Sequence, residues 1–144
     1  MLVRYLALFL VFISIISNAD EKFTLKVSVD NLRDSRGVVQ FTLYNRDGTI
    51  PDEKYQNLYK QHIKKITNSS AETIFGDLPK GRYAINILHD ENSNGKIDKG
   101  FILPIEGVGF SNYNSIDIIN KPNFKKASFK LNSNSKRAIK VIYF

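Results

Sequence analysis

Short runs in which apolar and polar residues alternate are the feature that most limits the possible folds of this chain. The clearest run covers 23–32, where Phe23, Leu25, Val27 and Val29 face one way and polar residues face the other. Alternation with a period of two is typical of a strand that is buried on one side only. The pattern therefore favours a β-protein over a bundle of helices.

Similar runs recur along the chain and are separated by turn residues such as Asp47-Gly48. They predict further strands at 37–45, 71–75, 82–89, 126–131 and 138–144. The predicted inward-facing residues of the 37–45 run are Val39, Phe41 and Leu43, and those of the 82–89 run are Tyr83, Ile85 and Ile87. The runs 23–32 and 37–45 are separated by a short turn, so we expect them to form a hairpin.

Two segments are less regular. In 53–68, Leu58, Ile63 and Ile66 would line one side of a short helix, but a loop with a brief strand fits equally well. The apolar segment 101–110 is interrupted by proline and glycine. With about seven short strands and no long helix, the chain is expected to be all-β, an antiparallel two-sheet sandwich with immunoglobulin-like or transthyretin-like Greek-key connections. A small closed barrel is the alternative.

The N-terminus has the composition of a secretory signal peptide at 1–19. Arg4 is followed by an apolar run at 6–16 and by the small residues Ser17 and Ala19 at the expected cleavage positions. The apolar run is shorter than the roughly 20 residues that a membrane-spanning helix needs. We therefore expect a single domain at 20–144 in an exported protein, periplasmic or extracellular, with no membrane span in the mature chain.

The net charge limits the possible partners, and the cysteine count limits how the domain is stabilised. The net charge is +7 and the chain contains no cysteine, so disulfides cannot stabilise the domain. A basic protein can attract nucleic acid, but an exported one rarely meets it. We expect a protein or glycan partner of unknown identity, no nucleic acid, and a solvated lysine-rich surface.

The segment 90–98 has the spacing of a calcium-binding loop. Asp90, Asn92, Asn94 and Asp98 place side-chain oxygens at loop positions 1, 3, 5 and 9, and Gly95 stands at position 6, where such a loop turns sharply. These four side chains and the main-chain carbonyl of Lys96 are the predicted metal ligands.

The loop is not an EF-hand, because position 12 is Phe101 instead of glutamate and the flanking segments are strands. Glu91 or Glu106 would have to complete the ligand set. With only two carboxylates within the spacing, the expected Kd for calcium is on the order of 10⁻⁴–10⁻³ M. A metal-free turn is the main alternative, because Asn94-Gly95 is by itself a strong turn signal.

Catalytic patterns are scarce. The chain has two histidines, and His89 and Asp90 are neighbours on a predicted strand, so their side chains should point to opposite faces. We assign no catalytic residue and expect a non-enzymatic protein. The alternative is a small hydrolase of the glycosidase type that uses Asp98 and Glu106 as its two carboxylates.

Two sequence blocks carry a resemblance to a known family. Residues 78–85 read Leu-Pro-Lys-Gly-Arg-Tyr-Ala-Ile, the calcium-like segment follows at 89–98, and residues 104–112 read Pro-Ile-Glu-Gly-Val-Gly-Phe-Ser-Asn. With Pro122, Phe124, Ala127 and Phe129 near the end, the chain resembles the bacterial domain of unknown function 2141. This resemblance implies an exported β-sandwich and no established activity.

Overall fold

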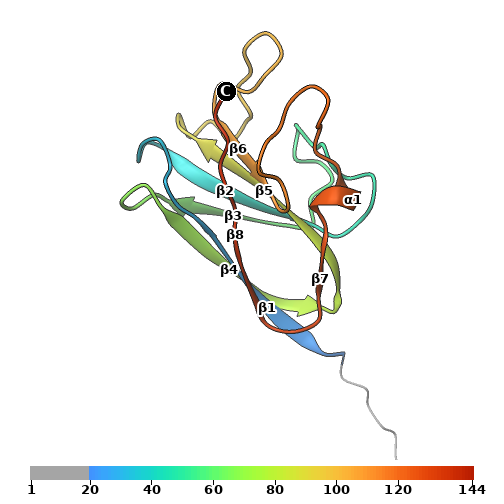
Figure 1. Ribbon diagram of the computed structural model, residues 1–144. Coiled ribbons are helices and arrows are strands. Elements are labelled where there is room, and N and C mark those ends of the chain that lie inside the picture. Colours follow the sequence, from blue (N-terminus) through green and yellow to red (C-terminus); the bar gives the residue numbers. More distant parts are fainter. Residues whose placement is uncertain (1–19) are drawn as a thin grey trace, which may run out of the picture.

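The computed structural model describes residues 20–144 (Figure 1). The predicted signal peptide at 1–19 lies outside the described residues. Within the part that is described, no helix combines the length and the apolar character needed to cross a membrane.

Two β-sheets face each other and make up almost the whole domain (Figure 1). The three-stranded sheet has the order β4-β1-β8 and consists of β1 (Lys22–Val29), β4 (Ala71–Pro79) and β8 (Ser135–Ala138). The second sheet has the order β3-β2-β5-β6 and consists of β2 (Val38–Tyr44), β3 (Lys60–Lys65), β5 (Gly81–Asp90) and β6 (Gly107–Phe110), with β7 (Phe129–Leu131) paired to β5. One helical turn, α1 (Phe124–Ala127), precedes β7. The predicted all-β, two-sheet class is confirmed.

The predicted hairpin between the first two strands is wrong. β1 pairs with β4 and β8, whereas β2 pairs with β3 and β5, so the chain crosses from one sheet to the other between them. Each strand has one strongly apolar face, and the crossing lets these two faces pack against each other. The pairing of β1 with β8 is parallel, the one departure from the antiparallel pattern among the described strand pairs.

Three predicted segments have different boundaries in the structure. In 53–68 the regular element is a strand, β3, and it pairs along the edge of β2. The predicted strand 126–131 starts as the helical turn α1, because Asn123 caps that turn by accepting a hydrogen bond from the Lys126 amide at 2.9 Å. The predicted strand 138–144 is displaced, since β8 ends at Ala138 and the following residues cross over β6.

The main core lies between the sheets. The inward-facing residues predicted for β1, β2 and β5 are all buried there, apart from Phe23, which is partly buried at the edge. Phe41 and Leu43 from one sheet and Leu25 and Val27 from the other are completely shielded from solvent. The alternating pattern therefore identified the faces that meet.

A second core covers the other face of the larger sheet, which the sequence pattern did not predict. Tyr44 and Ala84 of this face are buried beneath Ile50, Tyr113 and Phe124. As a result, all residues of β5 from Tyr83 to Asp90 are buried, on both faces.

Two glycines of β6 make room for the residues that follow β8. A Cβ at Gly107 would lie 2.3 Å from the ring of Tyr143, and a Cβ at Gly109 would lie 2.5 Å from the Lys140 carbonyl oxygen. The same segment is held to β6 by two hydrogen bonds between Val108 and Ile142, at 3.0 and 2.7 Å. Close approach of this main chain therefore requires glycine at 109, whereas at 107 a Cβ would meet the side chains of Tyr143 and Val141.

We expect Gly109→Ala to destabilise the domain by about 1–3 kcal/mol, because the new Cβ meets a main-chain oxygen that cannot rotate away. Gly76→Ala is the matched control, since a Cβ there meets nothing within 4 Å and its cost should be below about 0.5 kcal/mol. Urea unfolding of both variants measures the difference. Equal midpoints for the two variants would contradict the tight crossing.

Candidate functional site

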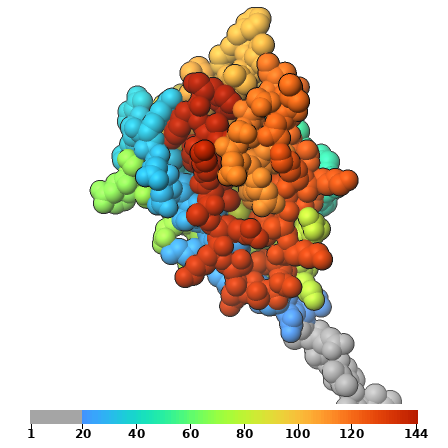
Figure 2. All heavy atoms as spheres, viewed as in Figure 1, coloured from blue at the N-terminus to red at the C-terminus, as the bar shows by residue number. Residues whose placement is uncertain are grey.

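The segment between β5 and β6 forms a loop at one end of the sandwich and projects from the surface (Figures 1 and 2). Glu106 holds this loop at two points. Its Oε1 accepts a hydrogen bond from the Glu91 amide at 3.0 Å, and its Oε2 accepts one from the Asp98 amide at 3.3 Å. Glu106 is buried, and this burial raises the pKa of its carboxyl group. The carboxyl group thus brings the first and last residues of the segment 91–98 together.

Asp90 anchors the turn itself. Its Oδ1 accepts a hydrogen bond from the Asn94 amide at 3.0 Å, and its Oδ2 accepts one from the Gly95 amide at 2.8 Å. The side chain of Gln40, on the neighbouring strand β2, donates to the same Oδ2 at 2.9 Å. Only 1% of Asp90 is exposed, so these hydrogen bonds are what satisfies a buried charge.

The remaining predicted ligands converge on Asp98. Asn92 Nδ2 lies 2.6 Å from Asp98 Oδ2, and Asn94 Nδ2 lies 2.9 Å from the same oxygen. Asn94 Oδ1 accepts a hydrogen bond from the Lys96 amide at 2.8 Å, which places Lys96 in the same turn. The structure therefore brings the predicted positions together in one tightly hydrogen-bonded loop.

Glu91 is directed away from this loop, contrary to its suggested role as an additional ligand. Its Oε2 accepts a hydrogen bond from Arg33 Nη2 at 2.8 Å, and this guanidinium lowers the pKa of the Glu91 carboxyl group. Glu106, the other suggested ligand, does lie beside the loop. Of the two glutamates, Glu106 alone is therefore placed to contribute an oxygen there.

Glu91 instead belongs to a cluster with Asp34 and His89, the one close group of three metal-ligating side chains found among residues 20–144. Both ring nitrogens of His89 already have partners: Nδ1 lies 2.7 Å from the Tyr143 hydroxyl and Nε2 lies 3.0 Å from the Arg36 carbonyl oxygen. Arginines also pair with both carboxylates. We interpret the cluster as a structural link between the 33–37 turn and the segment that follows β8.

One buried polar atom near the calcium-like loop has no partner. The hydroxyl oxygen of Tyr55 is shielded from solvent and makes no hydrogen bond with the described residues. Burial raises the pKa of this hydroxyl, and the charges of Asp90, Asp52 and Glu106 raise it further. The hydroxyl thus faces a group of carboxylates without being bonded to any of them.

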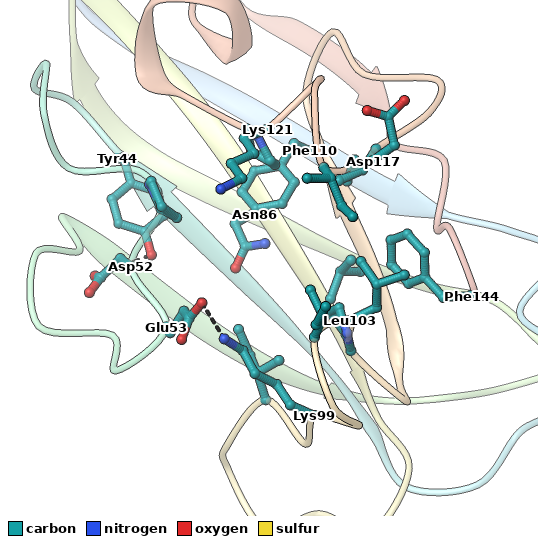
Figure 3. A pocket seen from close by; sticks show the side chains of 18 residues that line it. Tyr44, Asp52, Glu53, Asn86, Lys99, Leu103, Phe110, Asp117, Lys121 and Phe144 are labelled. Atoms are coloured by element: carbon teal, nitrogen blue, oxygen red, sulfur yellow. Dashed lines mark hydrogen bonds and ion pairs between the residues drawn. The ribbon is translucent and has the colours of Figure 1, made fainter.

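A cavity of about 350 Å³ lies on the outer face of the larger sheet (Figure 3). Tyr44, Asn86, Val108 and Phe110 of strands β2, β5 and β6 contribute to its lining. The walls come from the projecting loop, from residues 51–53 after β2, from the segment 116–122 and from Phe144. The residues of the projecting loop in the lining are Ile97, Lys99, Ile102, Leu103 and Pro104. The loop that carries the predicted metal ligands is therefore also a wall of the cavity.

The sequence analysis did not find this cavity, because its lining comes from segments far apart in the chain. The available signal in the sequence was the apolar segment 101–110, part of which lies exposed beside the cavity; Ile102, for example, is 59% exposed. Neither Asp98 nor Glu106, the two suggested catalytic carboxylates, belongs to the lining.

Comparisons with known proteins give one match. The model of a family described as "Uncharacterized protein conserved in bacteria (DUF2141)" matches residues 27–140. No curated protein and no solved structure matches the chain.

We expect Glu91→Gln to cost roughly 1 kcal/mol at neutral pH, a value that allows for the partial exposure of Arg33. Because the pKa of Glu91 is lowered in the folded state, its stabilising effect is complete above roughly pH 4.3, the pKa of a free glutamate, and is lost as the pH falls through the lower folded value. Urea unfolding at several pH values should show the gap to the wild type closing in acid.

The control for this test is Glu72→Gln, which removes an exposed ion pair with Lys26 and should change stability by less than about 0.5 kcal/mol. A gap between wild type and Glu91→Gln that stays constant down to pH 3 would contradict the assigned role of the Arg33–Glu91 pair.

Proposed function

The chain belongs to the bacterial DUF2141 family, and from this premise we propose that it is the non-enzymatic binding domain of an exported protein, with a loop at 90–106 that calcium stabilises. The N-terminal signal-peptide composition supports the export part of this proposal. The cavity beside the loop supports the binding part, because a concave apolar site is the usual place for a small ligand.

The observation that carries the calcium part is the convergence of Asn92, Asn94 and Asp98 on one point of the turn that Asp90 anchors. Calcium is bound by six to eight oxygens, supplied by carboxylates, amide carbonyls, main-chain carbonyls and water. The two asparagine amides now direct their NH₂ groups at Asp98. Rotating each amide would direct its carbonyl oxygen there instead, and a cation would replace the NH₂ groups as the partner of the carboxylate. The rotation gives up the hydrogen bonds that Asn92 Oδ1 and Asn94 Oδ1 now accept from the Asn94 and Lys96 amides, so the cation has to offset their loss.

Two neighbouring groups also support a cation in this place. Glu106 is buried beside the loop and would gain a countercharge, which would oppose the cost of burying its ionised form. The Tyr55 hydroxyl, without a partner among the described residues, has room in its hydrogen bonding for a water bound to the ion.

The geometry favours binding over hydrolysis. A hydrolase of the glycosidase type needs two carboxylates that flank a substrate in a cleft. Both oxygens of Glu106 accept main-chain hydrogen bonds, and Asp98 is engaged by the two asparagine amides. Because neither carboxylate lines the cavity, no observation favours the hydrolase alternative.

Millimolar calcium should raise the melting temperature of the protein by several degrees over a chelator control. Calcium at about ten times Kd, which is roughly 1–10 mM for the expected Kd, adds about 1.4 kcal/mol. Magnesium should have a smaller effect, since it requires a tighter octahedral arrangement of ligands. Differential scanning calorimetry measures both shifts.

Asp98→Asn keeps the shape of the loop and removes one charged ligand, so it should abolish most of the calcium shift. Asp30→Asn, at an exposed residue directly after β1, should keep the full shift. If wild type and both variants melt alike in calcium and in chelator, the loop is a metal-free turn and the calcium part of the proposal is wrong.

A further inference from the structure

Most of the large apolar side chains that are exposed to solvent gather at one end of the sandwich, which we call the apolar end. Of the ten such side chains among residues 20–144, seven belong to it: Phe101, Ile102, Leu103, Ile105, Ile118, Ile119 and Phe144. They come from three separate parts of the chain, and members of all three line one cavity. Single exposed apolar residues are ordinary, but a group of this size marks a surface that a partner covers.

The first part of the apolar end is a closed turn that projects from the molecule (Figure 2). Phe101 lies at its apex and is fully exposed. The Gly100 amide donates a hydrogen bond to the Leu103 carbonyl oxygen, and the Ile105 amide donates one to the Asp98 carbonyl oxygen, both at 2.9 Å. Because main-chain groups in an apolar medium need partners within the protein, these bonds lower the cost of placing the apex there.

The second part is the turn 115–120, which has the same construction. Ile119 is 97% exposed, and its amide and that of Asn120 both donate to Asp117 Oδ1 at 2.7 Å. The Asn120 side chain closes the turn by donating to the Ser115 carbonyl oxygen at 2.9 Å. A projecting apolar apex fits a fluid interface that closes around it, whereas a folded protein would need a matching concave site for each apex.

The charge of the chain is concentrated beside the apolar end. The segment 118–144 contains six lysines and one arginine and no aspartate or glutamate. None of these seven side chains forms an ion pair with another described residue. Figure 2 shows this segment, in orange and red, over much of the face in view. This face is therefore attracted to anionic surfaces.

Two of these ammonium groups lie directly beside the second turn. Lys121 follows Ile119 by two residues, and Lys126 Nζ lies 2.6 Å from Asn120 Oδ1. Asp117 is the acidic side chain of this turn, so one positive charge remains in excess.

The first turn adds no positive excess. Lys99 at its base is paired with Glu53, and the neighbouring Asp98 is acidic. Apolar contact therefore has to supply most of the affinity for a partner, and the lysines supply a smaller, electrostatic part.

We infer that the apolar end docks on the surface of a phospholipid bilayer that contains anionic lipid. The apices at Phe101 and Ile119 enter the headgroup region, and Lys121 and Lys126 pair with lipid phosphates. Interfacial binding of this kind combines buried apolar area with attraction to anionic lipid. An acidic polymer would use the lysines and leave both apices exposed. The inference goes beyond the proposed function, since it needs neither calcium nor a ligand in the cavity.

Cosedimentation with vesicles in the presence of a chelator tests the apolar contact. The wild type should bind vesicles of equal parts phosphatidylcholine and phosphatidylglycerol, and should bind phosphatidylcholine alone several times more weakly. Phe101→Ser and Ile119→Ser should each weaken binding to both kinds of vesicle about tenfold. Ile74→Ser is the matched control, because Ile74 is a 55% exposed residue on β4, away from the apolar end, and should bind as the wild type does.

The same assay tests the charge. Lys121→Gln should weaken binding to the mixed vesicles about three- to fivefold and leave binding to phosphatidylcholine alone unchanged. Lys22→Gln removes an exposed lysine at the start of β1, at the opposite end of the sandwich (Figure 1), and should leave both unchanged because it lies beyond the reach of screened attraction.

A fluorescent label tests the location, since the chain has no cysteine of its own. Gly100→Cys lies beside Phe101, and a Cβ there makes only an ordinary contact with the Leu103 carbonyl oxygen at 3.6 Å. An environment-sensitive dye on this cysteine should brighten when mixed vesicles are added. The same dye on Gly76→Cys, where a Cβ meets nothing within 4 Å, should not change.

The remaining outcomes would overturn the inference. They are a folded wild type that does not sediment with the mixed vesicles, and Phe101→Ser binding as well as the wild type while both are retained on heparin, which would indicate an acidic polymer. A wild-type dimer that Phe101→Ser dissociates would instead make the apolar end an interface between copies. Vesicle binding with the expected pattern and without a calcium shift in melting would support the inference and remove only the calcium part of the proposed function.

Discussion

Burial of strand β5 on both faces is the constraint on which the rest of the structure depends. A sandwich of two sheets needs only one buried face per sheet, and the opposite face of the larger sheet would ordinarily be solvated. Here the residues of β5 from Tyr83 to Asp90 are all buried, so a third layer has to cover them. The loop after β2 and the segment that contains α1 supply this layer, and the cavity lies where the layer is incomplete.

The inner face of the sandwich could be predicted because alternation reports burial directly, as it does for Leu25, Val27 and Phe41. The outer face could not, since its buried members include Gln40, Thr42 and Asn86. These polar side chains are tolerated because they bond to one another or to the main chain. Gln61 Nε2, for example, donates to both Gln40 Oε1 and Thr42 Oγ1, at 3.2 and 3.0 Å. A polar residue in a sequence pattern does not show whether it faces water or a partner.

The candidate site, too, could be predicted from the sequence only in part. The positions Asp90 to Asp98 were found because turn chemistry is local: the residues that bond to one another lie within a few positions along the chain. The role of Glu106 was only partly foreseen, as a ligand or a catalytic carboxylate, and its bonds to the Glu91 and Asp98 amides show that it also holds the two ends of the segment 91–98 together. The cavity and the Tyr55 hydroxyl depend on contacts between distant segments, which no spacing rule describes.

The parallel pairing of β1 with β8 also has a consequence for folding during synthesis. Leu25 to Ser28 pair with Ser135 to Ala138, and the Thr24 amide donates to Asn134, which lies 110 positions further along the chain. Contacts of such long range form slowly, because a large loop must close before they contribute. One edge of β1 therefore remains unpaired until residue 138 has been made, and a ribosome-bound chain that lacks these residues exposes that edge to other unfinished chains.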